Sequence, residues 1–184
     1  MAHLVLIAGP NGGGKTTLFQ HAYPNFDRID ADQISRSLRP HGARTETVEM
    51  GRHVLQLLGE ALSSERDIVF ETTFSGRHPV TLVERARRAG YICTIHFVML
   101  ADAELHVRRV ADRVRAGGHE VDPNTIRRRY VRSLENLEKN AHRFDRVVLI
   151  DNSEAPTVLF VKSNGDIEVR RDTILTHRLR ERLS

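Results

Sequence analysis

The sequence predicts an α/β protein with a mainly parallel β-sheet, and three observations carry this prediction. Short apolar runs rich in β-branched residues alternate with segments whose apolar residues recur at helical spacing. The first apolar run ends in a glycine-rich loop that leads into a helical pattern. The length of 184 residues suits one domain of ordinary size. We therefore expect a single three-layer domain over residues 1–184, built on five parallel strands.

The five expected strands are apolar runs bounded by turn residues. Continuous runs of this kind are typical of parallel strands that are buried on both faces. In chain order they are His3–Ala8, Phe26–Ile29, Asp67–Thr72, Tyr91–Leu100 and Arg146–Ile150.

Capping residues and apolar spacing place helices between these strands. One helix begins near Gly14 and another near Gln33, where the carboxylates of Asp30 and Asp32 can cap it. The later helices follow the same signals. They are expected over Thr45–Ser63, Pro79–Ala89 and Asp102–Ala116, and from Asp122-Pro123 onward.

The end of the chain predicts a β-hairpin that is additional to the five-stranded sheet. Two strand-like runs, Thr157–Val161 and Ile167–Arg171, flank an Asn164-Gly165 pair. Asn-Gly is the strongest short signal for a tight hairpin turn. A short basic helix, Ile174–Leu183, is expected after it.

Composition narrows the class of protein. Lysine and arginine number 28 against 24 acidic residues, and residues 108–146 alone hold eleven basic and six acidic side chains. A local positive field of this size suits a small polyanion such as a nucleotide. With five per cent aromatic residues, nucleic acid is disfavoured as a partner.

Nothing in the sequence predicts a membrane or secreted protein. No apolar run approaches the ~20 residues that a membrane-spanning helix needs. The first residues lack the basic region of a signal peptide, so we expect a cytoplasmic protein. The single cysteine, Cys93, lies inside an apolar run and is expected in the core.

The segment Gly9 to Thr16 carries the chemistry. It fits the pattern G-x-x-x-x-G-K-[ST] and lies between an expected strand and an expected helix. Backbone N–H groups of such a loop bind phosphate oxygens, the lysine reaches the β- and γ-phosphates, and the hydroxyl ligates Mg²⁺. The alternative is a chance glycine turn. The expected nucleotide-binding residues are Gly9, Pro10, Asn11, Gly12, Gly13, Gly14, Lys15, Thr16 and Thr17.

Five motifs in order resemble the zeta toxin family of P-loop kinases, over residues 4 to 153. They are Ile7 to Thr17, Ile29 to Ile34, Phe70 to Gly76, Arg113 to His119, and Asn152-Ser153. The resemblance implies an adenylate-kinase-like fold, phosphorylation of UDP-activated amino sugars, and inhibition by an epsilon antitoxin. The chain is shorter than the toxins with known sugar substrates and lacks their extended substrate-side segments.

A kinase that acts on a hydroxyl needs a carboxylate to accept the proton. Asp32 is the candidate, because it follows a short strand at the carboxyl edge of the sheet and matches the second aspartate of the family's D-x-D stretch. Its alternative role is a helix N-cap, and Asp30 is interpreted as structural. Glu71, with Thr72 and Thr73, ends a neighbouring strand and is expected to bind acceptor or a metal-bound water. A solvent-facing strand end is the alternative.

A lid is expected over about residues 113–124. Arg113 or Arg115 would neutralise charge on the transferred phosphoryl group, and Gly117-Gly118 would let the lid move. His119 would bind substrate or cap a helix. Arg128 is favoured for substrate binding over Arg127 and Arg129. A solvated arginine face with a glycine helix end is the alternative.

Asn152 follows the fifth strand, where this fold lines the adenine, so we expect it at the nucleotide. The favoured function is an ATP- and Mg²⁺-dependent kinase with a small-molecule acceptor and an antitoxin partner. Two other classes stay open: a nucleotide-dependent switch ATPase and a 5′-hydroxyl polynucleotide kinase. Asp32 with mobile arginines favours the kinase over the switch.

Overall fold

The computed structural model describes residues 1–30, 56, 57 and 59–184. Among these residues seven strands form one sheet, in the order β2-β3-β1-β4-β5-β6-β7. The first five are mutually parallel, and β6 and β7 are antiparallel to their neighbours. The strands are β1 His3–Ala8, β2 Asp27–Asp30, β3 Ile68–Thr72, β4 Ile92–Met99, β5 Arg146–Asp151, β6 Thr157–Ser163 and β7 Asp166–Val169.

The α/β class and the parallel orientation of the five expected strands are confirmed. The expected number of strands in the sheet was wrong, because the described sheet has seven strands and not five. The hairpin of β6 and β7 does not stand apart, because β6 pairs with β5 in register Val148 to Val161. An unpaired β5 edge would expose a row of backbone donors and acceptors. The hairpin covers that edge and extends the sheet to seven strands. Its turn is the expected one, with positive φ angles at Asn164 and Gly165.

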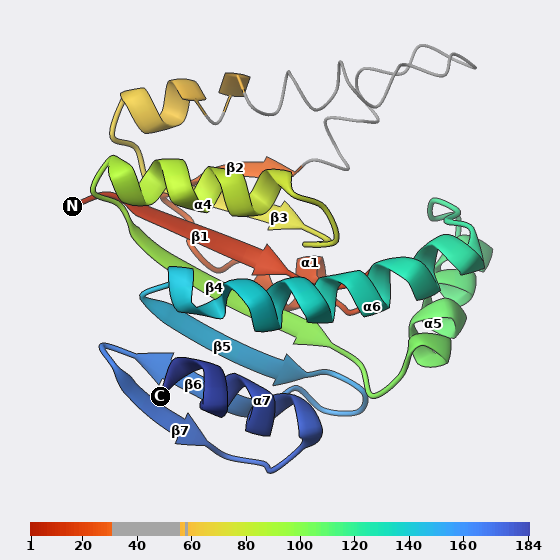
Figure 1. Ribbon diagram of the computed structural model, residues 1–184. Helices are drawn as coiled ribbons and strands as arrows, with labels where there is room; N and C mark the ends of the chain where they lie inside the picture. The colour runs from red at the N-terminus through yellow and green to blue at the C-terminus, as the bar shows by residue number, and fades with distance from the viewer. Residues whose placement is uncertain (31–55, 58) are drawn as a thin grey trace.

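Helices lie on both faces of the sheet, unequally (Figure 1). One face holds α4, α6 and α7, whose Leu82, Leu137 and Leu179 pack into a core with alternate residues of β1 and β4. The other face holds the short α1. The helices are α1 Lys15–Phe19, α4 His78–Arg88, α5 Ala103–Arg115, α6 Pro123–Asn140 and α7 Ile174–Leu183, with a 3₁₀ turn at Ala141–Arg143.

Two of the expected capping residues, Asp102 and Asp122, are confirmed. Asp102 accepts a hydrogen bond from the Leu105 N–H at 2.7 Å, and Asp122 accepts one from the Thr125 N–H at 2.8 Å. Residues 59–63 are helical, as expected for the end of the helix Thr45–Ser63. The rest of that helix up to residue 55, the helix near Gln33, and Asp32 lie outside the described residues.

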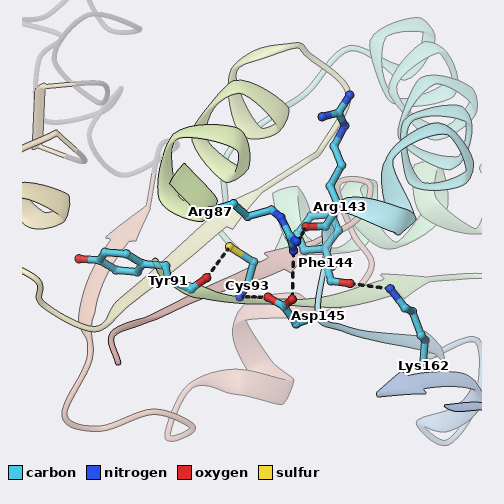
Figure 2. Close-up of polar contacts among 7 residues, drawn as sticks. All are labelled: Arg87, Tyr91, Cys93, Arg143, Phe144, Asp145 and Lys162. Atoms are coloured by element: carbon cyan, nitrogen blue, oxygen red, sulfur yellow. Dashed lines mark hydrogen bonds and ion pairs between the residues drawn. The ribbon is translucent and has the colours of Figure 1, made fainter. Parts of the chain in front are cut away.

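Asp145 joins three elements at the start of β5 (Figure 2). Its carboxylate accepts hydrogen bonds from the Cys93 N–H of β4 at 2.8 Å and from Arg87 of α4 at 3.0 Å. The Asp145 N–H donates in turn to the Cys93 carbonyl at 2.9 Å. Lys162 of β6 donates to the neighbouring Phe144 carbonyl at 2.8 Å. Cys93 is fully buried here, as expected of a core residue.

Among the described residues, no helix combines the length and the apolar character needed to cross a bilayer.

Candidate nucleotide-binding site

The glycine loop joins the end of β1 at Ala8 to the start of α1 at Lys15. Two of its glycines are required by geometry. A Cβ on Gly9, whose φ is +133°, would lie 1.9 Å from the Val98 carbonyl oxygen of β4. A Cβ on Gly14, at φ +86°, would lie 2.4 Å from the side-chain nitrogen of Asn152. Only glycine allows this close packing at these φ angles, so the loop is a specifically packed structure and not a chance glycine turn.

Lys15 is the first residue of α1, and its side chain folds back over the loop. Its Nζ donates to the carbonyls of Gly9 at 2.8 Å and Pro10 at 3.0 Å, and the residue is 8% exposed. A buried ammonium held by neutral carbonyls sits inside the curl of the loop. This is the place where phosphate oxygens meet the backbone N–H groups of such a loop.

Thr16 and Glu71 come together beside the loop. The Thr16 hydroxyl donates to Oε1 of Glu71 at 2.8 Å. Parallel pairing of β1 with β3 sets Glu71 opposite Ile7, two residues before Gly9. A hydroxyl and a carboxylate are the oxygen donors that Mg²⁺ prefers, and Mg²⁺ usually takes its other ligands from phosphates and water. These two residues fit a magnesium ion.

Asn152 contacts the loop directly. Its side-chain nitrogen donates to the Gly13 carbonyl at 2.9 Å, and its backbone N–H donates to the Met99 carbonyl at 2.9 Å. The segment after β5 therefore lies against the glycine loop. Contact of Asn152 with the adenine of a nucleotide stays a prediction.

These residues line a cavity of about 450 Å³, a volume within the usual range for small-ligand sites. Nine of its lining residues are candidates from the sequence and two are new. The lining is Asn11, Gly12, Gly14, Lys15, Thr16, Thr17, Glu71, Arg113 and Asn152, together with Arg109 and Asp112.

Arg113 and Arg115, the two arginines expected in the lid, have different surroundings at the end of α5. Arg113 lines the cavity, and its Nη2 donates to the His119 carbonyl at 3.0 Å. Arg115 forms an ion pair with Asp112, and its side chain is 78% exposed. His119 is exposed and does not line the cavity. Of these candidates, the structure brings Arg113 alone to the loop.

Gly117 and Gly118 end α5 in a Schellman motif. The Gly117 N–H donates to the Val114 carbonyl at 2.9 Å, and the Gly118 N–H donates to the Arg113 carbonyl at 2.8 Å. Gly117 has φ +87°, which is the left-handed conformation this motif requires. The glycine helix end is therefore present, and movement of the lid stays a prediction.

The three consecutive arginines of α6 have different partners. Arg127 pairs with Glu104 of α5, with Nε 2.6 Å from Oε1. Arg128 points to solvent and donates to Thr125 at 3.5 Å. Arg129 donates to the side-chain oxygen of Asn11 at 3.0 Å. The arginine that reaches the loop is thus Arg129, whereas the sequence favoured Arg128.

Thr72 and Thr73 lie at the end of β3, outside the cavity lining. The Thr72 hydroxyl accepts from the Phe74 N–H at 3.1 Å, and the Thr73 and Ser75 hydroxyls lie 2.9 Å apart. Both threonines shape the turn that follows Glu71.

His106 is a residue that the sequence analysis missed. It is fully buried, its Nε2 accepts from the Leu100 N–H at 3.1 Å, and its Nδ1 lies 2.8 Å from the Asn11 carbonyl oxygen. Because Nε2 accepts, the proton is on Nδ1, which donates to Asn11. Burial lowers the pKa of His106 to about 4, and the nearby charge of Lys15 acts in the same direction. A neutral imidazole therefore holds the loop.

Arg109 was also missed. It lines the cavity and donates to the Ser153 carbonyl at 2.8 Å. The spacing of Arg109 and Arg113, four residues apart on one helix, puts both on the same face. This four-residue spacing is the feature of the sequence that could have identified Arg109 as a neighbour of Arg113.

Sequence comparison relates this chain to a known protein family. A family model described as "AAA domain" matches residues 4–137. An uncharacterized protein of Haemophilus influenzae is 26% identical over 130 residues, which cover 68% of this chain and 91% of that protein.

Solved structures share the fold. A structure from the PezAT chromosomal toxin-antitoxin system of Streptococcus pneumoniae superposes with a TM-score of 0.68 at 20% identity, over 98% of this chain and 78% of the other. A complex of AvrRxo1-ORF1 and AvrRxo1-ORF2 with ATP gives a TM-score of 0.71 at 15% identity, over 100% and 63% of the two chains.

Proposed function

Because the chain belongs to the AAA domain family and has the P-loop kinase fold, we propose that it is an ATP- and Mg²⁺-dependent phosphotransferase of the zeta toxin type. The acceptor is a hydroxyl group of a small molecule. One observation carries the proposal: Lys15, Glu71 and Arg113, from three separate elements, line a single cavity around the glycine loop. Phosphoryl transfer needs this combination of phosphate cradle, metal ligand and mobile cation.

The nucleotide side of the reaction follows from the loop. Backbone N–H groups of residues 11–16 and the Lys15 ammonium hold the β- and γ-phosphates, and Asn152 lies beside them. Thr16 and Glu71 would hold Mg²⁺. When bound, this ion neutralises charge on the phosphate oxygens. The AvrRxo1 complex with ATP, which shares the fold, supports ATP as the nucleotide.

On the acceptor side, we propose a role for each of the remaining candidates. Asp32 is the proposed general base. It takes the proton of the acceptor hydroxyl as the hydroxyl oxygen bonds to the γ-phosphorus of ATP, and the bond from that phosphorus to the β,γ-bridging oxygen breaks, so that ADP leaves. Arg113 stabilises the negative charge on the transferred group, with Arg115 as the second lid arginine. Glu71, which lines the cavity, is proposed to contact the acceptor as well as the metal site. Thr72, Thr73, His119 and Arg128 lie outside the cavity lining and are proposed as further acceptor contacts.

The resemblance to zeta toxins makes a UDP-activated amino sugar the acceptor to test first. The structural likeness to the PezAT toxin-antitoxin system supports an antitoxin protein as a partner.

Incubation with γ-labelled ATP and a metabolite extract tests the proposal. We expect the label to move to a small molecule, identified by mass spectrometry, with UDP-N-acetyl amino sugars added singly in parallel. Asp32→Asn is the matched control, because the amide keeps the size and capping ability of aspartate but cannot take the proton.

Two results would favour the other classes. Release of labelled inorganic phosphate at the same rate with and without extract would identify a switch ATPase. Labelling of a 5′-hydroxyl oligonucleotide in preference to the extract would identify a polynucleotide kinase. Either result would contradict the proposed function.

A further inference from the structure

A second cavity, of about 330 Å³, lies on the α1 face of the sheet toward the amino ends of the strands. The glycine loop follows the carboxyl end of β1, so the two cavities lie apart and share no lining residue. The register defines the floor of the second cavity. Val5 of β1 pairs with Thr94 of β4, and Thr94 pairs with Arg146 of β5. These three residues form one row across three parallel strands, which spans about 10 Å.

Aromatic rings form the wall of this cavity. Tyr23 and Phe26, from the segment after α1, have ring centroids 5.1 Å apart. The Tyr23 ring also lies 5.9 Å from that of His96, and its hydroxyl is 2.6 Å from His96 Nε2. A planar ligand that enters between this wall and the strand row would pack on ring faces.

Tyr23 is held in an uncommon backbone conformation, with φ +59°. A bulky residue in the left-handed region costs free energy, and such strain persists where surrounding contacts enforce it. Here the contacts are those of the Tyr23 ring with Phe26 and His96. The strained backbone of Tyr23 thus accompanies the placement of its ring at the cavity.

The cavity is open because this face of the sheet has little cover. In the part of the chain that the structure describes, α4, α6 and α7 pack on the opposite face, and α1 alone covers this one (Figure 1). Leu18 of α1 packs farther along the strands with Val98 and Val148, while Phe19 packs there and also against the cluster of Val5. Val5 is buried under the neighbouring rings, whereas Thr94 is partly exposed and Arg146 is exposed.

The charge of the cavity has one sign. Arg146 is exposed, and among the described residues no carboxylate pairs with it, whereas Arg87 and Arg143 each have an acidic partner. No acidic side chain lines the cavity. Burial lowers the pKa of His96 to about 4, so its imidazole is neutral at pH 7. The cavity therefore offers the Arg146 guanidinium beside the neutral ring of His96. His3 also lines it, with Nδ1 3.3 Å from Oδ1 of Asp67.

We propose that this cavity binds a small aromatic carboxylate, whose ring packs beside the Tyr23-Phe26 wall over Thr94 while its carboxylate pairs with Arg146. The planar guanidinium matches a carboxylate in a two-point hydrogen bond. The distance from β1 to β5 accommodates one ring with its acid group. The proposal is independent of the proposed kinase activity, since neither cavity uses a residue of the other.

Titration calorimetry with benzoate as the probe tests the site. Benzamide and benzamidinium have the same ring with a neutral or a positive group and serve as matched ligands. We expect benzoate to bind with a dissociation constant of about 1 mM or below, and both analogues to bind at least tenfold more weakly. Absence of saturable benzoate binding, or equal affinities for the three ligands, would overturn the proposal.

Arg146→Gln should weaken benzoate binding at least tenfold and leave the affinity for MgATP unchanged. Arg132→Gln is the matched control, because Arg132 is exposed on α6 and lies outside both cavities. Amide shifts in NMR spectra should centre on Thr94 and His96. Equal benzoate affinity in the Arg146 variant, or shifts centred on the glycine loop, would show that the acid binds elsewhere and overturn the site.

Discussion

The Thr16 hydroxyl donates a 2.8 Å hydrogen bond to the Glu71 carboxylate, across 55 positions of sequence. Thr16 belongs to the first turn of α1 and Glu71 to the end of β3. Because β3 is the parallel neighbour of β1, the carboxyl ends of both strands meet at the glycine loop. The two oxygens that would hold a magnesium ion are thus adjacent before any nucleotide binds.

The first prediction concerns Glu71. Glu71→Gln keeps an oxygen that accepts from Thr16 but removes the negative charge that favours Mg²⁺. We expect the Mg²⁺ concentration for half-maximal turnover to rise about 10- to 100-fold, with little change in thermal stability. Glu135→Gln, on the exposed face of α6, is the control. A normal Mg²⁺ requirement in the Glu71 variant would exclude a role in metal binding.

The second prediction separates the two lid arginines. Arg113→Ala should lower the rate of phosphoryl transfer about 10²-fold or more with a small effect on ATP affinity, because its charge acts chiefly on the transition state. Arg115 is paired with Asp112 at the exposed end of α5, so Arg115→Ala should lower the rate less than tenfold. Single-turnover kinetics measure both. A larger loss in the Arg115 variant would mean that the lid rotates to bring Arg115 to the phosphate.

The third prediction is a pH dependence of stability. The pKa of His106 in the folded protein is about 4, against 6.5 for the free side chain, chiefly because the residue is buried. Between these values the unfolded chain binds a proton that the folded chain does not. Stability should therefore fall as pH falls from 6.5 to 4, by about 3 kcal/mol from this residue. Chemical denaturation at several pH values measures it.

His96 also has a folded pKa of about 4 and should contribute a similar loss. His106→Gln separates the two, since the amide can accept from Leu100 and donate to Asn11 without titrating. About half of the pH dependence should disappear in this variant. An unchanged slope would show that His106 is not neutral in the folded protein.

The fourth prediction uses the single cysteine. Burial raises the pKa of Cys93 to about 12, and the Asp145 carboxylate acts in the same direction. The thiol should not react with a thiol reagent until the protein unfolds. Asp145→Ala leaves the Cys93 N–H without its acceptor (Figure 2), which should cost about 1–2 kcal/mol and speed labelling. Fast labelling of the native wild-type protein would contradict this.

Local signals predicted much of the fold. The capping aspartates, the Asn164-Gly165 turn and the short helix Ile174–Leu183 were each specified by residues within a few positions of one another. The place of the hairpin was not, because pairing of Val148 with Val161 depends on which strand edge is left open after the sheet assembles. No periodicity within the hairpin encodes that choice.

The candidate site likewise has parts that local sequence predicted and parts that depend on tertiary packing. The glycine loop and its lysine are contiguous in sequence, and the pattern predicted them. The contacts of Arg129 and His106 with Asn11 join positions more than 90 residues apart. A histidine on the inner face of an amphipathic helix is typical of an ordinary core residue, so sequence alone did not distinguish His106. The choice of Arg129 over Arg128 depends on the rotation of α6 against the loop, which packing decides.

Calorimetry of MgATP binding to wild-type protein and Lys15→Ala, with turnover measured on the same samples, tests the central claim most directly. Lys15 places its ammonium inside the loop, 2.8 Å from the Gly9 carbonyl oxygen, and should bridge the β- and γ-phosphates throughout the reaction. Lys139→Ala is the matched control, because the Lys139 side chain is exposed on the surface of α6. We predict at least tenfold weaker MgATP binding and no detectable turnover for Lys15→Ala alone. Unchanged affinity together with unchanged turnover would show that this loop is not the nucleotide site.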